Sequence, residues 1–151
     1  VLYLKKHQVK RCRLVLRKAA KADYKDFDTS TNAPEAIVVG DIGETWDYPL
    51  LNGLMNQLLD GAKLVALHKG RYFQTKNGLT LDSGAFVAAL EHASETKAFV
   101  VGKPEAAFFE LATQGLEGQP HQIAMVGDDL INDIGGAQKM KYQTLLIVNM
   151  I

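Results

Sequence analysis

Cysteine is nearly absent from this chain of 151 residues, and its single cysteine, Cys12, excludes an intramolecular disulfide and any metal site built from several cysteines. Cys12 alternates with Leu14 and Leu16, a pattern that favours a buried structural thiol. Long apolar runs are also missing, because no stretch approaches the roughly 20 residues that a membrane-spanning helix needs. No basic segment followed by an apolar one opens the chain, so we expect no signal peptide. These absences predict a cytoplasmic protein with no membrane partner.

Net charge is lacking too, since 17 basic residues balance 17 acidic ones, but the two signs are unevenly distributed. Residues 1–27 carry nine Lys or Arg and two Asp, which gives this stretch a charge of +7. A basic end can bind nucleic acid. However, neither a pattern of aromatic stacking residues nor a glycine-rich RNA motif accompanies it, and Lys and Arg commonly coat solvated surfaces. We therefore predict no nucleic-acid partner; a steep salt dependence of binding would support the alternative.

What the chain does contain is an alternation of short apolar runs with helical patterns. The runs predict strands over residues 11–16, 36–40, 63–67, 98–101, 122–126 and 144–148. Apolar residues at a spacing of three and four predict helices over residues 46–59, 84–93 and 130–139. Asn77-Gly78 predicts a hairpin turn, and Pro104 is expected to open a further helix. Strands that alternate with helices predict an α/β fold with parallel strands.

The richest chemistry lies where a buried strand runs into Gly127 and is followed by Asp128, Asp129 and, four residues later, Asp133. In open α/β sheets, ligands bind beyond the carboxyl ends of the strands. Three crowded carboxylates need a cation to neutralise them, and hard oxygen ligands suit Mg²⁺. The alternative is an acidic turn whose charges are stabilised by the N-terminus of the following helix. The spacing alone leaves both interpretations open.

A second polar position is Lys103, which follows a predicted strand and Gly102 and precedes Pro104. This order places an ammonium group at the same edge of the sheet as the carboxylates. Such a lysine can neutralise a phosphate and keep a carboxylate nucleophile ionised. The alternative is a solvated surface lysine, although lysine and carboxylates together are more specific than either alone.

Together these motifs resemble the haloacid dehalogenase superfamily, in its branch of NagD-like phosphatases. The resemblance covers nearly the whole chain and rests on Gly102-Lys103-Pro104, Val126-Gly127-Asp128-Asp129 with Asp133, Gly135-Gly136-Ala137, and the segments 58–62, 66–73 and 84–91. It implies an α/β cap domain over residues 1–81 and the C-terminal part of a Rossmann-like three-layer core over residues 82–151. The implied activity is Mg²⁺-dependent hydrolysis of a small phosphorylated substrate.

The resemblance also implies roles for individual residues. Lys103 matches the lysine that contacts nucleophile and phosphate, and Asp128 matches the aspartate that ligates Mg²⁺. Asp129 and Asp133 match acidic positions that complete or support the metal shell. His68, Lys69 and Arg71 fall where such caps carry a substrate-binding loop, although a polar loop after a strand is the plainer interpretation. Relatives with such caps often pair through them, which leaves a homodimer through the cap open.

Two further motifs of the family are not found in this sequence. Its nucleophile is the first aspartate of an Asp-x-Asp-type or Asp-x-Ser-type motif, which is followed by a Thr or Ser motif that binds phosphate. Asp28-Thr29-Ser30 has a similar order but lacks a preceding apolar strand. Since the chain also begins inside a helical pattern at Val1, we expect the nucleophile to lie upstream in a longer protein. We then expect this chain alone to be inactive, and a catalytically silent binding or oligomerisation protein is the competing hypothesis.

Overall fold

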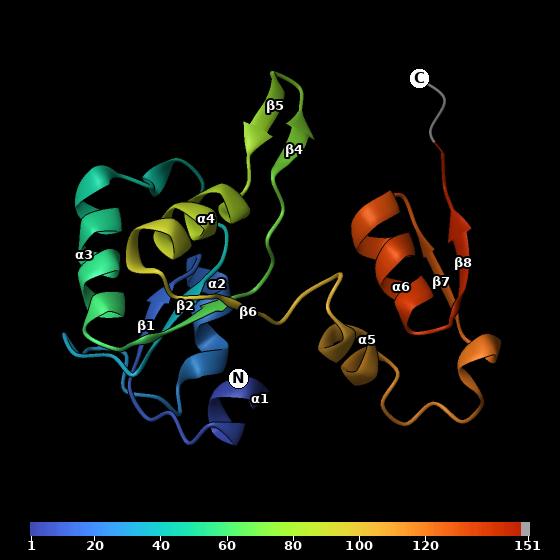
Figure 1. The fold of residues 1–151 in the computed structure, drawn as a ribbon, viewed down its shortest axis with the longest axis horizontal. Coiled ribbons are helices and arrows are strands. Elements are labelled where there is room, and N and C mark those ends of the chain that lie inside the picture. Colours follow the sequence, from blue (N-terminus) through green and yellow to red (C-terminus); the bar gives the residue numbers. More distant parts are fainter. Residues whose placement is uncertain (149–151) are drawn as a thin grey trace. The chain divides into compact units, whose positions relative to one another are not determined.

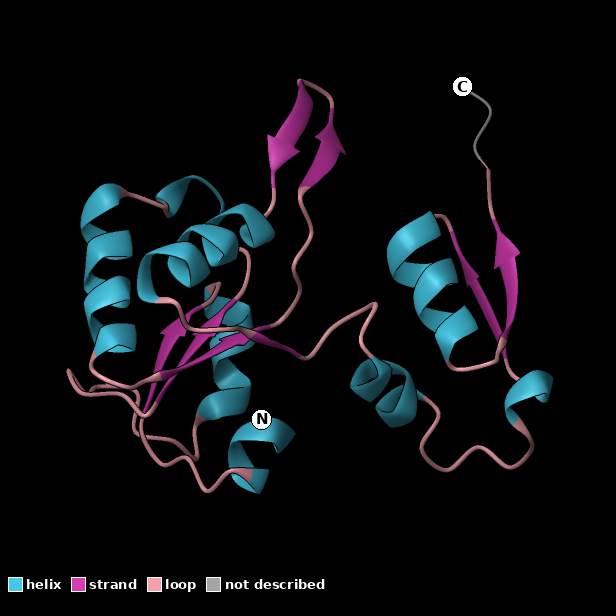
Figure 2. Ribbon diagram, in the orientation of Figure 1, coloured by secondary structure: helices cyan, strands magenta, loops and turns pink. Residues whose placement is uncertain are grey.

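The computed structural model describes residues 1–148 and divides the chain into two compact units, Val1–Val100 and the residues from Val101 onward. Figure 1 shows the elements of each unit, and Figure 2 separates their helices from their strands. The helix and the strand predicted over residues 84–93 and 98–101 belong largely to the first unit. The boundary between the two units, after Val100, therefore lies later in the sequence than the boundary predicted near residues 81–84. The assignment of residues 1–81 to a cap and of residues 82–151 to a core stays a prediction.

The first unit is built on a four-stranded parallel sheet. Its strand order is β1-β2-β3-β6, and the strands span Cys12–Val15, Ala36–Val39, Lys63–Ala66 and Phe99–Val100. Both faces of the central strand β2 are buried, as its unbroken apolar run predicts for a parallel sheet. The predicted strands and their parallel direction are thus confirmed in this unit. The strand β1 lies at one edge of the sheet.

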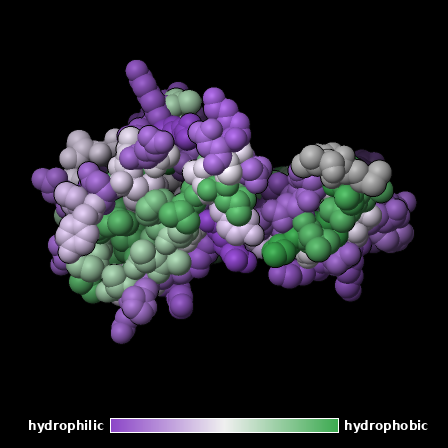
Figure 3. Space-filling view, turned by 90° about the horizontal axis from the view of Figure 1, so that it is seen from above, coloured by the Kyte–Doolittle hydropathy of each residue, from purple (hydrophilic) through white to green (hydrophobic). Residues whose placement is uncertain are grey.

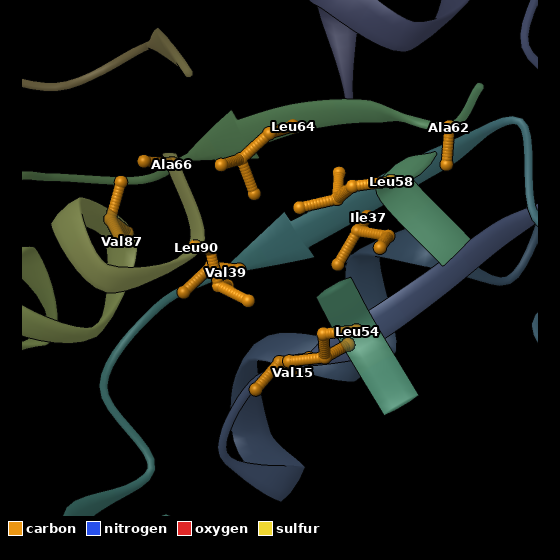
Figure 4. Packing of buried hydrophobic residues seen from close by; sticks show 10 residues of the cluster. All are labelled: Val15, Ile37, Val39, Leu54, Leu58, Ala62, Leu64, Ala66, Val87 and Leu90. Carbon is orange, nitrogen blue, oxygen red and sulfur yellow. The ribbon is translucent and has the colours of Figure 1, made fainter. Parts of the chain in front are cut away.

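Helices pack against this sheet and close its core. The two longest are α3, Tyr48–Leu59, and α4, Ser83–Ser94, and the shorter ones are α1 (Leu2–Lys6), α2 (Lys18–Lys21), η1 (Ala22–Tyr24) and η2 (Gly43–Thr45). Figure 4 shows apolar side chains of α3 and α4 meeting those of the strands in one cluster. Leu54 of α3 and Val87 of α4 are both fully buried there. Each such side chain adds about 1.5–3 kcal/mol relative to leaving it exposed.

The helix α3 starts two residues later than predicted. Asp47 caps it by accepting a hydrogen bond from the backbone N–H of Leu50 at 2.7 Å, and a capping residue has extended rather than helical dihedrals. Trp46 therefore lies before the helix, where its ring stacks on Phe86 with centroids 4.4 Å apart. This contact joins the start of α3 to α4.

A hairpin follows the third strand, as Asn77-Gly78 predicts. The strands β4, Tyr72–Thr75, and β5, Gly78–Leu81, pair antiparallel, and Gly78 takes the positive φ of +107° that glycine tolerates best. The cross-strand register places Tyr72 opposite Leu81. Figure 1 shows this hairpin extending away from the sheet of the first unit.

The second unit is smaller and contains a two-stranded parallel sheet. Its elements are α5 (Ala106–Ala112), η3 (Pro120–Gln122), β7 (Ala124–Gly127), η4 (Leu130–Gly135), α6 (Gly136–Lys139) and β8 (Gln143–Leu146). The strands β7 and β8 pair in parallel, with Val126 opposite Leu145. Both of these side chains are more than half exposed. Figure 3 shows the apolar residues of this unit gathered in a green band.

Two helices of the second unit differ from the prediction. Pro104 does not open a helix: the N–H of Glu105 donates to the carbonyl of Gly102 at 3.1 Å, which closes a turn, and α5 begins at Ala106. The helix predicted over residues 130–139 begins with the π-helical segment η4, because the Asp129 carbonyl accepts from Ile134, five residues ahead, at 3.1 Å. Among residues 1–148, no helix has both the length and the apolar character needed to cross a membrane.

Candidate active site

The turn after β7 carries the first two predicted carboxylates, but they have different surroundings. The side chain of Asp129 caps η4: it accepts from the backbone N–H of Ile131 at 2.9 Å and of Asn132 at 2.8 Å, and from the Asn132 amide at 2.6 Å. Burial alone would raise the pKa of Asp129, but these hydrogen bonds outweigh it, so the pKa lies below its ordinary value. Asp129 is thus ionised and committed to the helix start, a role that the alternative interpretation of an acidic turn predicts.

Asp133 lies one turn into η4 and pairs with Lys103. The ammonium nitrogen of Lys103 lies 2.5 Å from Oδ1 of Asp133, whose residue is only 4% exposed. The backbone N–H of Asp129 donates to the other carboxylate oxygen at 3.3 Å. The sequence prediction that lysine and carboxylates meet is therefore confirmed for this pair, since residues 30 positions apart are brought together.

A close approach of the chain makes room for Asp133. A side chain at Gly127 would collide with the Asp133 carboxylate, so only a glycine at the end of β7 leaves space for it. Gly136 is similarly constrained, because a β-carbon there would lie 2.6 Å from the Phe109 ring and 3.0 Å from the α-carbon of Pro104. Both glycines hold the segment around Lys103 against η4 and α6.

Asp128 is the carboxylate that remains available. It is exposed and makes no hydrogen bond or ion pair with any residue between 1 and 148. It lines a cavity of about 330 Å³ whose other walls are apolar: Leu130, Leu146, Ile147 and Val148. A carboxylate without a competing partner at the carboxyl end of a parallel strand is the group in this unit best placed to accept a ligand.

The three carboxylates do not form a self-contained metal site. No group of three or more His, Cys, Asp or Glu side chains in the described part of the chain is arranged to hold a metal ion. The assignment of Asp128, Asp129 and Asp133 as metal ligands stays a prediction. Asp129 holds the backbone of η4 and Asp133 holds Lys103, so Asp128 is the one of the three without a partner among residues 1–148. The residues present therefore fit at most one corner of a Mg²⁺ site.

The predicted cap loop is held by internal contacts. His68 Nε2 lies 2.8 Å from Oδ1 of Asp82 and 2.9 Å from Oγ of Ser83. Because both contacts use the same ring nitrogen, His68 cannot take a proton from Ser83 while Asp82 orients its other nitrogen, as a catalytic triad requires. The three residues fasten the loop to the start of α4, where Asp82 also caps the helix by accepting from Ser83 N–H at 2.6 Å.

The two cations of the loop also differ. Lys69 Nζ lies 2.5 Å from Glu91 of α4. Burial alone would raise the pKa of Glu91, but the hydrogen bonds from Lys69 and from the backbone N–H of Ala98 lower it below its ordinary value. Arg71 is exposed, lies 5.4 Å from the Tyr72 ring centre and forms no ion pair among residues 1–148. Arg71 is thus the residue of the three predicted ones that remains free to meet an anion.

Sequence reasoning did not foresee the partners of this loop. Asp82 and Glu91 carry no motif that would mark them as neighbours of residues 14 and 22 positions earlier. The usable signal was that Asp82 directly precedes the predicted helix, a position typical of an N-cap.

Known proteins of one family match this chain. Residues 100–149 match the family described as HAD-hydrolase-like. The chain is 45% identical over 134 residues to haloacid dehalogenase-like hydrolase domain-containing protein 2 of Bos taurus. The matched region covers 89% of this chain and 51% of that protein. It is 38% identical over 144 residues to phospholysine phosphohistidine inorganic pyrophosphate phosphatase of Homo sapiens. That match covers 94% of this chain and 53% of the human protein. This chain belongs to the haloacid dehalogenase-like hydrolase family.

Solved structures share the fold of this chain. A thermostable NPPase from Geobacillus stearothermophilus matches this haloacid dehalogenase-like chain with a TM-score of 0.85 and 25% identity, over 99% of this chain and 62% of that one. NagD from E. coli K-12 matches its fold with a TM-score of 0.82 and 24% identity, over 97% of this chain and 58% of that one. The predicted NagD-like fold is confirmed. The chain spans about half the length of the curated relatives.

Proposed function

We propose that the protein to which this haloacid dehalogenase-like chain belongs is a Mg²⁺-dependent phosphohydrolase that acts on a small phosphorylated substrate in the cytoplasm. The observation that carries the proposal is the Lys103–Asp133 ion pair on the unit that presents the unpartnered Asp128 at a strand end. The relatives named above as a pyrophosphate phosphatase and an NPPase support a phosphate ester or phosphoramidate as the substrate class.

Each residue has a separate task in this proposal. Asp133 holds the Lys103 ammonium group in place, and Lys103 offsets the negative charge on the phosphoryl oxygens as the bond to the leaving group breaks. Asp128 supplies one oxygen ligand to Mg²⁺, which would add positive charge at the phosphoryl group when bound. Asp129 keeps the turn in place rather than binding the ion. The attacking carboxylate comes from an aspartate outside this sequence and splits the reaction into two steps.

The loop of the first unit contributes the substrate contacts. Arg71 offers its guanidinium group to an anionic substrate, while His68 and Lys69 fix the loop that carries it. We place this loop in a cap over residues 1–81 and leave a homodimer through that cap as part of the proposal.

The test is a comparison of carboxylate variants in the intact protein with p-nitrophenyl phosphate as substrate. Asp128→Asn should lower kcat by two or more orders of magnitude, because one ligand of the ion is lost. Asp129→Asn should leave kcat within a few-fold, since asparagine caps helices nearly as well as aspartate. An unchanged rate in Asp128→Asn would overturn the metal role.

A catalytically silent binding protein is the second candidate, since Asp129 holds the backbone of η4 and Asp133 holds Lys103. Calorimetric titration of the intact protein with Mg²⁺ separates the two. Binding that Asp128→Asn abolishes supports the phosphohydrolase, whereas no binding together with no turnover supports the silent protein.

A further inference from the structure

A basic pocket opens at the outer edge of the sheet in the first unit. The residues that line it are distant in sequence from those of the candidate active site. It encloses about 380 Å³, the lower part of the range typical of small-molecule sites. Its walls come from the edge strand β1 and from the segment that follows α2. The residues that line it include Arg13, Leu14, Lys21, Tyr24, Lys25 and Phe27.

The charge in this pocket has no counterpart. Three of its residues are cationic, and no carboxylate lines it. Arg13 is half-buried, and among residues 1–148 its only side-chain hydrogen bond is to the neutral amide of Gln57 at 3.2 Å. Neither Lys21 nor Lys25 forms an ion pair within the described residues. Lys21 and Lys25 are exposed, and neither has a carboxylate partner in residues 1–148 that would compete with a bound anion.

The nearby acidic groups are mostly occupied elsewhere. Asp26 pairs with Lys5 at 2.8 Å, and Asp28 accepts from the backbone N–H and the hydroxyl of Ser30. Asp23 lies close enough to Tyr24 to act on its phenol, but it does not line the pocket. Asp23 and Asp28 therefore reduce the positive potential of the pocket, whereas the charge of Asp26 is offset by Lys5.

Neutral donors accompany the cations. Burial raises the pKa of Tyr24, so its hydroxyl stays protonated. That hydroxyl has no hydrogen-bond partner in residues 1–148. Its oxygen is not fully buried, so it is accessible to solvent. The N–H of Cys12 donates outward to the Asp28 carbonyl at 2.9 Å. Because alternate residues of a strand direct their backbone groups to the same side, the N–H of Leu14 faces this outer edge as well.

We propose that this basic pocket binds a small anion with two or more negative charges. The shared chemistry is that of phosphate groups and of polycarboxylates, both of which lysine, arginine and backbone N–H groups recognise. Phe27 forms an apolar wall, which leaves room for the carbon skeleton of an organic anion. The proposal uses none of the residues assigned to phosphate hydrolysis and so does not rest on that function.

The test is a titration of the ¹⁵N-labelled chain, without divalent ions, first with inorganic phosphate and then with citrate. We expect saturable shifts of the amide signals of Leu14, Lys21 and Lys25 with at least one of the two anions. The anion that binds more tightly identifies the phosphate or the carboxylate source. Shifts at Lys103 and Asp128 would report the candidate active site separately, so that the two proposals can fail independently.

Variants of equal charge change provide the control. Lys21→Gln with Lys25→Gln should weaken binding at least fivefold, whereas Lys6→Gln with Lys10→Gln, from the same basic stretch but outside the pocket, should change it less than twofold. Equal weakening in both variants, or no saturable shift at the pocket with either anion, overturns the proposal. If the chain binds a short DNA duplex and both double variants weaken that binding equally, the basic stretch would be assigned to nucleic acid. That result would also overturn the proposal.

Discussion

Asp128, Asp129 and Asp133 follow one strand, yet each carboxylate has different neighbours. Asp128 faces solvent, Asp129 holds backbone N–H groups, and Asp133 holds an ammonium group. The spacing of the three does not distinguish these roles, because they depend on which partner arrives from the backbone of η4 or from residue 103. Their consequences for stability differ accordingly.

Replacing Asp133 should destabilise the second unit, whereas replacing Asp128 should not. Asp133→Asn removes the charge that faces Lys103, whose side chain is 37% exposed. We expect a loss of about 1–3 kcal/mol, below that of a fully buried pair. Asp128→Asn should stay within about 0.5 kcal/mol. Hydrogen exchange of peptides over residues 124–146 measures both, and equal protection in the two variants would contradict the assignment.

Asp129 should make the second unit sensitive to acid. Its pKa is lower in the folded chain than in the unfolded one, where a typical value is about 3.9. A depressed folded pKa adds stability that is present above the unfolded value and is lost as the pH falls through the folded value. The same exchange experiment from pH 6 to pH 3 should show protection falling below about pH 4. Asp129→Asn should flatten this fall, and an unchanged profile would show that another group is responsible.

At the scale of elements, α4 and the loop before the hairpin are in unusually close contact. The N–H of Gly84 donates to the Gly70 carbonyl at 3.0 Å, and a β-carbon at Gly84 would lie 2.6 Å from the carbonyl carbon of Lys69. The atoms that such a β-carbon would meet, in Lys69 and Gly70, belong to the backbone and cannot rotate away. This contact sets how the loop with His68 and Arg71 approaches the helix.

The same substitution should therefore have opposite effects in two helices. Gly84→Ala should destabilise the first unit by about 1–3 kcal/mol, since overpacking displaces the loop backbone. Gly53→Ala in α3 should stabilise it by about 0.5–1 kcal/mol, because the nearest atom to its β-carbon would be 3.9 Å away and alanine favours helix. Urea denaturation followed by the fluorescence of Trp46 measures both. A loss of stability in both variants would remove the role of the loop contact.

Most elements could be predicted because their signals are local. The apolar runs of β2 and β3 and the hairpin turn at Asn77-Gly78 lie within a residue or two of their predicted places. The errors fall where a non-local or competing bond decides the outcome. The turn closed by Glu105 N–H moves the start of α5, and the shared Asp129 carbonyl converts the first turn of the next helix to a π-helical form. Spacing does not encode either bond.

At the scale of the whole molecule, the second unit leaves apolar surface open on its sheet. Val126 and Leu145 oppose each other across β7 and β8 and are 51% and 60% exposed, and Ile147 and Val148 add to the surface. Contiguous apolar patches of this kind usually contact another protein surface. The relatives are about twice as long as this chain, which is consistent with a surface that further residues cover.

This surface should be measurable as dye binding. The chain of residues 1–151 should bind 8-anilinonaphthalene-1-sulfonate, and Val126→Thr with Leu145→Thr should reduce the bound fluorescence at least twofold. Leu59→Thr, which replaces a leucine of α3 in the first unit that is 60% exposed, serves as the control and should change it little. Equal fluorescence in both variants would show that the dye binds elsewhere.

The candidate site was predictable in composition but not in arrangement. Lys103 and Asp133 meet as expected, but not at the edge of one sheet, because β6 before Lys103 pairs with β3 whereas β7 before Asp133 pairs with β8. The commitment of Asp129 to η4 was one of two interpretations that the sequence left open. The pairing of Lys69 with Glu91 could not be foreseen, because it depends on which face a helix presents.

The collision between a side chain at position 127 and the Asp133 carboxylate has a consequence for how this sequence can evolve. Gly127 and Asp133 are epistatic: neither site drifts freely while the other keeps its residue. Because the β-carbon of Asp133 would itself lie 2.6 Å from an added one, an alanine at position 127 is tolerated only with a glycine at position 133 or a shift of η4, and loss of the carboxylate releases Lys103 from its ion pair. Lineages that lose the lysine contact should therefore be those in which position 127 diversifies.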